Sequence, residues 1–316
     1  MLTSHAATTA IRPPAAPEVL HERPAYRPFE ASVARVSALS PNFVRITFRG
    51  EQLAGFGTAG LDQRVKVVLP LESGFTHFPR TGEWYSQWRA LPERQRNPFR
   101  TYTVRAVRPA QCEVDIDFVA HGTAGPASAW ALNARPGDPI VLVGPDETSI
   151  GRTIGIDWRP GMVSTVLLAG DETAAPAIGA ILASLPADAR GCALIEVPTP
   201  ADELELVTPE AVEVRWLPRG RGIPHGGALI PAVRDWTARR LRAGIDQPPL
   251  EEIDVDRELL WDVPEGLSLD GEFYAWLAGE ASVIKTLRRF LVAEAGLDRR
   301  SVAFMGYWRQ GRSELD

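Results

Sequence analysis

Residues 100–103 combine, on one short run, side chains that suit a flat, phosphate-bearing ligand. The run at 99–107 reads FRTYTVRAV, and its Val, Thr and Tyr content is typical of a β-strand. On a strand, Arg100 and Tyr102 share one face and Thr103 lies on the other. An arginine can bind two pyrophosphate oxygens at once, a tyrosine can lie against a planar ring, and a threonine can hydrogen-bond to the ring's edge. Alone, the same tetrapeptide would also fit an edge strand with a surface arginine.

A second candidate anion site follows the next strand-like run, in the segment HGTAGPASAWA at 121–131. Pro126 suits the first turn of a helix, so we expect a helix to begin there. Backbone N–H groups at a helix start attract an anion, Gly125 leaves room for one, and Ser128 adds a hydroxyl. The alternative is an ordinary helix start after a turn. Two such features one strand apart favour the phosphate-bearing ligand.

Two similar turns in the second half of the chain predict a nucleotide site. Each places a strand before and a helix after a short Ala-Gly-acid sequence, which is the context of a dinucleotide-binding turn. The full G-x-G-x-x-G pattern and a P-loop lysine are both absent. Acidic residues would repel a nearby phosphate unless they cap the helices, and capping is the simpler role for them. The residues of the two turns are Gly170, Asp171, Glu172, Thr173 and Ala174 in the first, and Gly279 and Glu280 in the second.

Short strand-like runs, separated by Gly, Pro, Asn and Asp, must position the first two features. Strands at this spacing predict a small antiparallel barrel. A long polar and aromatic insertion at 71–98 separates the third and fourth runs. We expect a functional loop with a helical turn there, because loops of this length inside a compact domain are often functional. The six runs are residues 31–40, 42–50, 64–70, 100–109, 112–120 and 138–145.

After Trp158 the pattern changes to strands that alternate with helices, which predicts a parallel sheet with helical crossovers. An acidic insertion at 243–267 is expected to form a surface excursion. The predicted fold class is therefore α+β with two domains, an antiparallel six-stranded barrel followed by a doubly wound α/β domain. Strands are expected at 163–170, 192–197, 212–217, 273–279 and 301–308, and helices at 171–185, 201–207, 228–241 and 280–296.

Composition limits the kinds of partner. The 316-residue chain has 34 Lys and Arg against 40 Asp and Glu, and this acidic balance argues against nucleic acid and against a polybasic membrane contact. No apolar run has the length of a transmembrane helix, and residues 1–27 lack a secretory signal pattern and are expected to be disordered. Cys112 and Cys192 are expected to be buried thiols, as in a reducing cytoplasm. His77 and His225 are expected in surface loops, and no cluster has metal-site spacing.

Five motifs, taken together and in order, resemble the FAD-binding siderophore-interacting proteins. These are ferric-siderophore reductases within the ferredoxin–NADP reductase superfamily. The motifs are RTYT, HGTAGPASAWA, AGDETAAPAI, WLAGEASVIKTLRRFL and the terminal GYWRQGR, and the resemblance runs from about residue 28 to residue 312. It implies an FAD-binding barrel domain at 28–150 and an NAD(P)H-binding domain with a C-terminal extension at 158–316, after a lead-in at 1–27.

The resemblance also implies roles for the motif residues. Arg100 would bind the pyrophosphate of FAD, Tyr102 would pack on the isoalloxazine, and Thr103 would lie near N5. The two turns would bind NAD(P)H, and neither a catalytic residue beyond the flavin nor a metal ligand is implied. The chain departs from the wider superfamily in lacking its GGTG-like turn and its C-terminal aromatic residue. Further flavin contacts would come from His121, Gly122, Gly125 and Ser128.

The residues leave the choice between NADH and NADPH open. Glu196 ends the second strand of the α/β domain, where an acid can bind a ribose diol and favour NADH. Arg215, Arg219 and Arg221 lie in or after the next strand and could bind a 2′-phosphate instead, and Arg219 is included in the expected nucleotide site. The resemblance favours NADPH.

The expected acceptor is a ferric siderophore, which is often anionic and therefore needs local positive charge. Lys66 shares a strand face with Arg64, and Arg309 lies in the GYWR motif; the resemblance points to Lys66 and Arg309 as substrate contacts. The expected function is NAD(P)H-dependent reduction of a ferric siderophore, with release of ferrous iron, by a monomeric cytoplasmic flavoprotein. The alternatives are a flavin electron-transfer component serving an oxygenase and a non-catalytic siderophore-binding protein.

Overall fold

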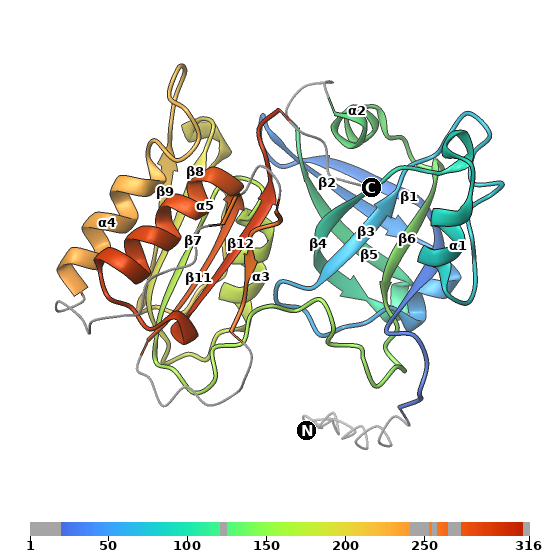
Figure 1. The fold of residues 1–316 in the computed structure, drawn as a ribbon. Helices are drawn as coiled ribbons and strands as arrows, with labels where there is room; N and C mark the ends of the chain where they lie inside the picture. The colour runs from blue at the N-terminus through green and yellow to red at the C-terminus, as the bar shows by residue number, and fades with distance from the viewer. Residues whose placement is uncertain (1–19, 121–124, 241–252, 255–257, 265–272, 312–316) are drawn as a thin grey trace, which may run out of the picture.

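The N-terminal half of the chain closes into a barrel. The computed structural model describes residues 20–120, 125–240, 253–254, 258–264 and 273–311. Six antiparallel strands follow the order β1-β2-β5-β4-β3-β6 around the barrel (Figure 1). Their bounds are β1 Tyr26–Ala38, β2 Phe43–Arg49, β3 Arg64–Val68, β4 Phe99–Arg108, β5 Glu113–Val119 and β6 Pro139–Pro145.

Alternation along these strands fills the barrel with apolar side chains. Val65 and Val67 of β3 lie in the barrel core, whereas Lys66 between them points outward and is half-buried. Helix α1 (Trp84–Ala90) lies in the long insertion, and its Trp84 and Trp88 join a separate cluster with Phe99, on the outside of the barrel. Helix α2 (Pro126–Asn133) packs on the barrel core through Ala127 and Ala131.

The C-terminal half forms a mostly parallel sheet with the order β10-β12-β11-β7-β8-β9. Its strands are β7 Thr165–Gly170, β8 Arg190–Val197, β9 Val212–Pro218, β10 Trp261–Asp262, β11 Phe273–Glu280 and β12 Val302–Trp308. Among the described strands of this sheet, only β10 runs antiparallel to its neighbour. From β7 the chain builds outward to β8 and β9 and then returns to β11 on the other side of β7. The switch point of the topology therefore lies between β7 and β11, where open α/β sheets bind ligands at their carboxyl edge.

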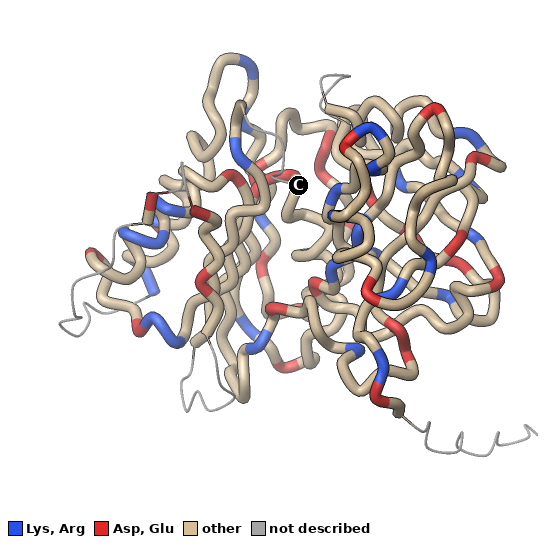
Figure 2. The backbone as a smooth tube through the Cα atoms, turned by 45° about the vertical axis from the view of Figure 1, so that its right-hand side comes forward, with Lys and Arg blue, Asp and Glu red and all other residues tan. Residues whose placement is uncertain are grey.

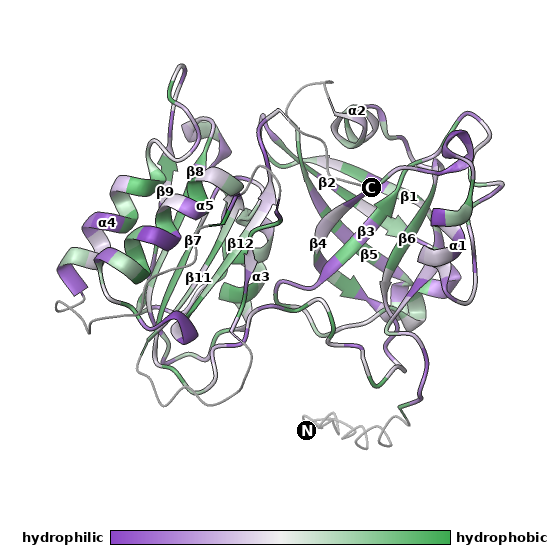
Figure 3. Ribbon diagram, viewed as in Figure 1, coloured by the Kyte–Doolittle hydropathy of each residue, from purple (hydrophilic) through white to green (hydrophobic). Residues whose placement is uncertain are grey.

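Helices cover both faces of this sheet. Helix α3 (Ala175–Ser184) packs on one face, and α4 (Leu229–Arg240) and α5 (Ala281–Arg288) pack on the other. In Figure 3 the hydrophobic colour runs along the strands, while α4 and α5 also carry hydrophilic positions. The barrel with a doubly wound α/β domain confirms the predicted fold class.

The two domains contact each other through buried carboxylates. Asp202 ends the 3₁₀ turn that follows β8. Its carboxylate accepts hydrogen bonds from two residues of the barrel domain, the Ser40 hydroxyl at 2.7 Å and the Asn42 side chain at 2.8 Å. At another point of the boundary, Asp62 accepts a 3.1 Å hydrogen bond from the indole of Trp276 in β11. Phe43 of β2 belongs to the apolar core of the α/β domain. These contacts fix the barrel against the face of the sheet that α3 covers.

Several local predictions were wrong. No α-helix forms at 201–207; a short 3₁₀ turn ends at Asp202, and Leu204 and Leu206 then pack on the α/β core with the two-residue period of extended chain. Cys112 lies half-buried in a left-handed turn rather than buried in a strand, while Cys192 is buried. Part of the 243–267 insertion is not a surface excursion, since Trp261 and Asp262 form edge strand β10.

Three further expectations concern membrane-spanning helices, metal sites and the N-terminal lead-in. Within that part, no helix has the length and apolar character to cross a bilayer. The described residues also contain no group of three or more His, Cys, Asp or Glu that could hold a metal ion. The expected lead-in at 1–27 lies mostly outside the described residues, which begin at residue 20, and β1 already begins at Tyr26.

Candidate functional site

Strand β4 pairs with different neighbours along its two halves. Its first half, residues 99–103, pairs with β3, and Tyr102 lies opposite Val65. Pairing with β5 begins only at Val104, opposite Ile116, and a bulge follows directly. Among the described strands, the first half of β4 therefore has a ladder on one side only. Such a break, next to a bulge, exposes a strand edge to a ligand.

The candidate flavin residues stand at this edge on both faces of β4. Arg100 and Tyr102 share one face, as the alternation predicted, and because they lie opposite the inward-pointing valines of β3 this face is the barrel interior. The Tyr102 ring is half-buried and lies 4.4 Å from the ring centre of Phe118. Thr103 faces outward, opposite Arg64, and is buried. A planar ligand at a strand edge can contact side chains of both faces.

Lys66 lies on the outer face of the same two strands. Its ammonium donates a 3.3 Å hydrogen bond to the Thr101 hydroxyl and lies 4.7 Å from the ring centre of Phe99. Phe99 in turn packs on Trp84 and Trp88 of α1. The long insertion thus supports the surface that carries Lys66. Figure 2 shows Lys and Arg positions along the part of the barrel that lies beside the α/β domain.

The predicted helix start at Pro126 is confirmed, with Gly125 as the residue before the helix. A Cβ atom at Gly125 would meet no atom of the described residues within 4 Å, so they leave space beside its backbone. Ser128 lies half-buried in the first turn of α2. His121 and Gly122, the remaining candidate flavin contacts, lie outside the described residues.

The two candidate nucleotide turns meet at the carboxyl edge of the sheet. Gly170 at the end of β7 pairs with Ala278 of β11, and a Cβ atom on Gly170 would lie 2.5 Å from the Ala278 carbonyl oxygen. The next residue of β11, Gly279, has φ +148°, a conformation that favours glycine. At Gly170, therefore, the close approaches that require glycine are to the neighbouring strand and to the Ala174 Cβ atom, also at 2.5 Å. Ala174, at the start of α3, is fully buried.

Asp171 joins the two turns to the end of β12. Its carboxylate accepts hydrogen bonds from the N–H of Thr173 at 2.9 Å, the N–H of Glu280 at 2.8 Å and the indole N–H of Trp308 at 2.8 Å. Burial, reinforced by the nearby charge of Glu172, raises the pKa of Asp171 to about 6. Glu280 caps α5 by accepting from the N–H groups of Ser282 and Val283, as a helix cap should.

Arg219 and its partners form a buried ionic network beside the first turn. Its guanidinium donates to both oxygens of Glu172, at 2.6 and 2.8 Å, and to Glu196 at 3.2 Å. Both carboxylates are fully buried. Glu172 is therefore an ion-pair partner and does not cap α3. The other hydrogen bonds to Glu196 come from the backbone N–H groups of Gly226, Ala228 and Leu229, at and before the start of α4.

Sequence reasoning missed the side chains that surround the GYWR motif. Tyr307 stacks on Trp261 of β10 at 5.8 Å between ring centres, and the Arg64 guanidinium lies 4.6 Å from the Trp261 ring. His225 is half-buried rather than a surface residue, and its ring stands edge-on to Trp308 at 4.7 Å. The available signals were the aromatic pair in GYWR and the lone tryptophan in an acidic insertion. Arg309 follows Trp308 directly and is half-buried.

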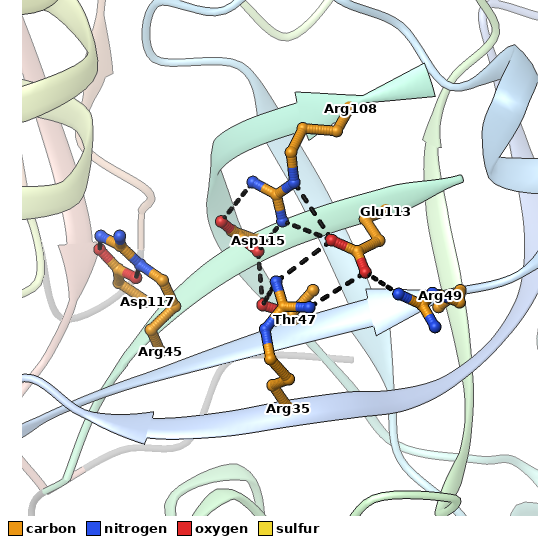
Figure 4. A network of polar contacts seen from close by, with 8 residues as sticks. All are labelled: Arg35, Arg45, Thr47, Arg49, Arg108, Glu113, Asp115 and Asp117. Carbon is orange, nitrogen blue, oxygen red and sulfur yellow. Dashed lines mark hydrogen bonds and ion pairs between the residues drawn. The ribbon is translucent and has the colours of Figure 1, made fainter. Parts of the chain in front are cut away.

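A separate ionic network covers the outer face of the barrel. Figure 4 shows Arg35, Arg108 and Arg49 directed at the carboxylate of Glu113. The hydrogen bond from Arg35 is the main cause that lowers the pKa of Glu113 to about 2. Arg108 also binds Asp115, at 2.6 and 2.7 Å. The network ties β1, β2, β4 and β5 together.

Comparison with known proteins assigns both halves of this arrangement. Residues 32–149 match the family model described as a siderophore-interacting FAD-binding domain, and residues 163–311 match the one described as siderophore-interacting protein. The chain belongs to the siderophore-interacting protein family. Members of this family bind FAD in the first of these domains, so the barrel of this siderophore-interacting protein is its FAD-binding domain.

Individual relatives cover nearly the whole chain. It is 31% identical over 282 residues to the ferric vibriobactin reductase ViuB of Vibrio cholerae, covering 89% of each chain. It is 27% identical to the NADPH-dependent ferric-chelate reductase of Escherichia coli, covering 88% of this chain and 92% of the other. The crystal structure of a siderophore utilization protein from T. fusca superposes with a TM-score of 0.69 at 30% identity, covering 93% and 97%. This siderophore-interacting protein is accordingly an oxidoreductase.

Proposed function

We propose that this protein is an FAD-containing, NADPH-dependent ferric-siderophore reductase of the cytoplasm. One observation carries the proposal: helix α3, which begins at the nucleotide turn of β7, lies against β4, the strand with the open edge and the RTYT residues. This contact supports a donor site at the carboxyl edge of the sheet, next to the strand that we propose for the flavin. The ViuB similarity supports a ferric siderophore as the acceptor.

The residues at the open edge of β4 fit the isoalloxazine and pyrophosphate of FAD. Arg100 supplies the fork-shaped cation, Tyr102 a half-buried ring and Thr103 a hydroxyl on the opposite face. Gly125 and Ser128, at the start of α2, supply a second place for a phosphate or a hydroxyl of the cofactor. When bound, FAD supplies the chemistry the reaction needs, since a nicotinamide gives two electrons as hydride and a flavin can release them singly to ferric iron.

The protein itself has to position the donor, the flavin and the acceptor. At the donor site, the acidic residues of the two described turns are buried. Asp171 and Glu172 turn inward onto Trp308 and Arg219, so their charges do not face a nucleotide phosphate. Arg219 is committed to two buried carboxylates, and Glu196 to the start of α4. We therefore place the 2′-phosphate of NADPH against Arg221, which is exposed on the loop after β9.

The acceptor site that we propose lies between Lys66 and Arg309. Both are half-buried cations, one on the outer face of β3 and one after β12. An anionic ferric chelate would be drawn to them although the whole chain is acidic. Reduction releases the metal because siderophores hold hard ferric iron more tightly than ferrous iron. We also propose that the protein acts as a monomer.

Anaerobic spectroscopy of the purified protein tests this proposal. The protein should be yellow, NADPH should bleach it faster than NADH, and a ferric chelate should restore the colour while a ferrous-specific chelator reports the product. Bleaching followed by reoxidation only with a redox protein would favour the oxygenase electron-transfer component. Chelate binding without bleaching by either nucleotide would favour a non-catalytic siderophore-binding protein.

A further inference from the structure

The C-terminal residues 308–310, which we name the tail segment, are held by carboxylates from both nucleotide turns. Trp308 donates its indole N–H to Asp171 of the first turn at 2.8 Å. Gln310 donates its backbone N–H to Glu280 of the second turn at 3.4 Å. The residue between these two contacts is Arg309. Asp171 and Glu280, two of the acids that looked unsuited to a phosphate turn, thus each have a partner in the tail segment, whereas Glu172 pairs with Arg219.

A break in strand register turns Trp308 toward Asp171. Along β11 and β12 the residues pair in step up to Gly279 opposite Gly306, and then Glu280 lies opposite Trp308. Tyr307 is the extra residue, and it stacks on Trp261 instead. Bulges of this kind commonly re-aim a side chain beside a functional site.

The space around Asp171 is shaped for this contact. The carboxylate is almost fully buried, and a Cβ atom on Gly279 would lie 2.7 Å from its Oδ2 atom. Oδ2 accepts from both Glu280 N–H and Trp308 Nε1, and Oδ1 accepts from Thr173. A buried carboxylate with donors on both oxygens is held in one orientation. The Asp171 carboxylate therefore holds the two turns and the tail segment together.

We propose that Asp171 is a positioning residue for both substrates: by holding Trp308 against the two nucleotide turns, it places Arg309 for the ferric chelate and keeps the donor site assembled. This inference rests on the proposed function for its two substrates. Asp171 itself contacts neither of them. Its contacts with the chain, and the position of the Trp308 ring, can be measured without any turnover.

The proposal has a pH signature. Protonated Asp171 carries a hydrogen on one oxygen and cannot accept from all its present donors, so the Trp308 contact should weaken as pH falls through about 6. The charged or titratable groups around Asp171 are Glu172 with Arg219, Glu280 and Tyr307, and His225 lies against Trp308, the donor to Asp171. Because histidines also change charge near neutral pH, His225→Gln is a necessary control.

The first experiment follows the Trp308 ring in the oxidised holoprotein. The near-ultraviolet circular dichroism difference between the parent and Trp308→Phe isolates that indole, and it should change between pH 7.5 and pH 5 around pH 6. Asp171→Asn, which presents an amide N–H to two N–H donors, should show the low-pH spectrum at every pH. His225→Gln should keep the transition. A Trp308 signal independent of pH, or unaltered in Asp171→Asn, would overturn the proposal.

Asp62 offers a matched control within the same chain. Its carboxylate is also buried, also accepts a 3.1 Å bond from a tryptophan indole, Trp276, and burial also raises its pKa to about 6. It holds the domain boundary and does not touch the tail segment. Asp62→Asn should therefore leave the Trp308 difference spectrum and its transition unchanged, and a loss of that transition would assign the effect to Asp62 instead.

The second experiment separates positioning from general damage. Asp171→Asn should raise the Kd of NADP⁺, measured by calorimetry, and the KM of an anionic ferric chelate, each by roughly tenfold, as loss of a charge-assisted hydrogen bond allows. Arg309→Ala should raise only the chelate KM. If Asp171→Asn does not fold, Trp308→Phe tests the same contact, and unchanged values for both substrates would overturn the proposal. If NADPH fails to reduce the parent protein, the proposed function is contradicted. The Trp308 spectra still test whether Asp171 holds Trp308.

Discussion

The carboxylate of Asp171 occupies the place where a side chain on Gly279 would lie. An ideal Cβ atom on Gly279 would stand 2.7 Å from Asp171 Oδ2 and 2.8 Å from Cγ. Glycine is thus required at position 279 because the Asp171 carboxylate leaves no room there for a side chain. Neither residue needs a bound nucleotide to explain its identity, although both lie at the switch point of the sheet.

Gly279→Ala should therefore cost more than an ordinary glycine replacement. The variant combines backbone strain at φ +148° with a collision against Asp171, and we expect a loss of about 2–3 kcal/mol in the free energy of unfolding. Urea unfolding measures it. Gly74→Ala is the matched control, because Gly74 also has positive φ, +66°, but open space around it. Equal losses in the two variants would show that the contact with Asp171 adds nothing.

Arg100→Ala should weaken FAD retention. The predicted loss is one charge-assisted pair with the pyrophosphate, about 1.5–3 kcal/mol, which corresponds to roughly a tenfold to hundredfold weaker Kd. Dialysis followed by flavin absorbance measures retention. The flavin retention of Arg100→Lys should lie between that of the parent and that of Arg100→Ala, because lysine keeps the charge but lacks the forked guanidinium. The assignment fails if the alanine variant holds flavin as tightly as the parent.

Replacing Lys66 and Arg309 together by alanine should raise the KM for an anionic ferric chelate while bleaching by NADPH stays fast. Both cations would act by attraction, so the difference from the parent should shrink at high salt, where charges are screened. Steady-state kinetics at low and high ionic strength checks this. Arg94→Ala, an exposed cation in the 71–98 insertion, is the control for net charge. Unchanged kinetics with several chelates at low salt would exclude this pair as the acceptor site.

The ionic network around Glu113 should make the barrel sensitive to acid. Its pKa in the fold is about 2, below the ordinary 4.5, so its ion pairs stabilise the fold above that ordinary value and lose this effect as pH falls toward 2. Glu113→Gln should lower the free energy of unfolding at pH 7 by about 1–2 kcal/mol, a modest figure because its Arg35 and Arg49 partners are more than half exposed.

The difference between Glu113→Gln and the parent should shrink as the pH approaches 2. Denaturant unfolding at several pH values follows it. Asp298→Asn, which breaks a solvent-exposed pair with Arg300, should change stability little at any pH. A difference between Glu113→Gln and the parent that does not depend on pH would show that packing, rather than charge, accounts for the loss.

Local sequence pattern was sufficient for the fold class, because its causes are local. The alternation of Val65, Lys66 and Val67 predicted that the lysine lies on the face opposite the two valines, and strands alternating with helices predicted a parallel sheet. Where two periods competed, the tertiary structure decided. Leu204 and Leu206 suit a helical run by composition, yet in the fold both pack on the α/β core while Glu203 and Glu205 beside them are exposed, which is the two-residue period of extended chain.

The partners of the acidic turn residues were beyond the reach of the sequence. The sequence placed Asp171, Glu172, Gly279 and Glu280 in two turns at one sheet edge and raised the question of how acids could stand beside a phosphate. The partners of these acids are distant in the sequence. Trp308, which binds Asp171, is 137 residues away from it, and Arg219, which binds Glu172, is 47 residues away. Charge and spacing indicate that a buried acid needs a donor, but only the folded chain brings a particular donor within hydrogen-bonding distance.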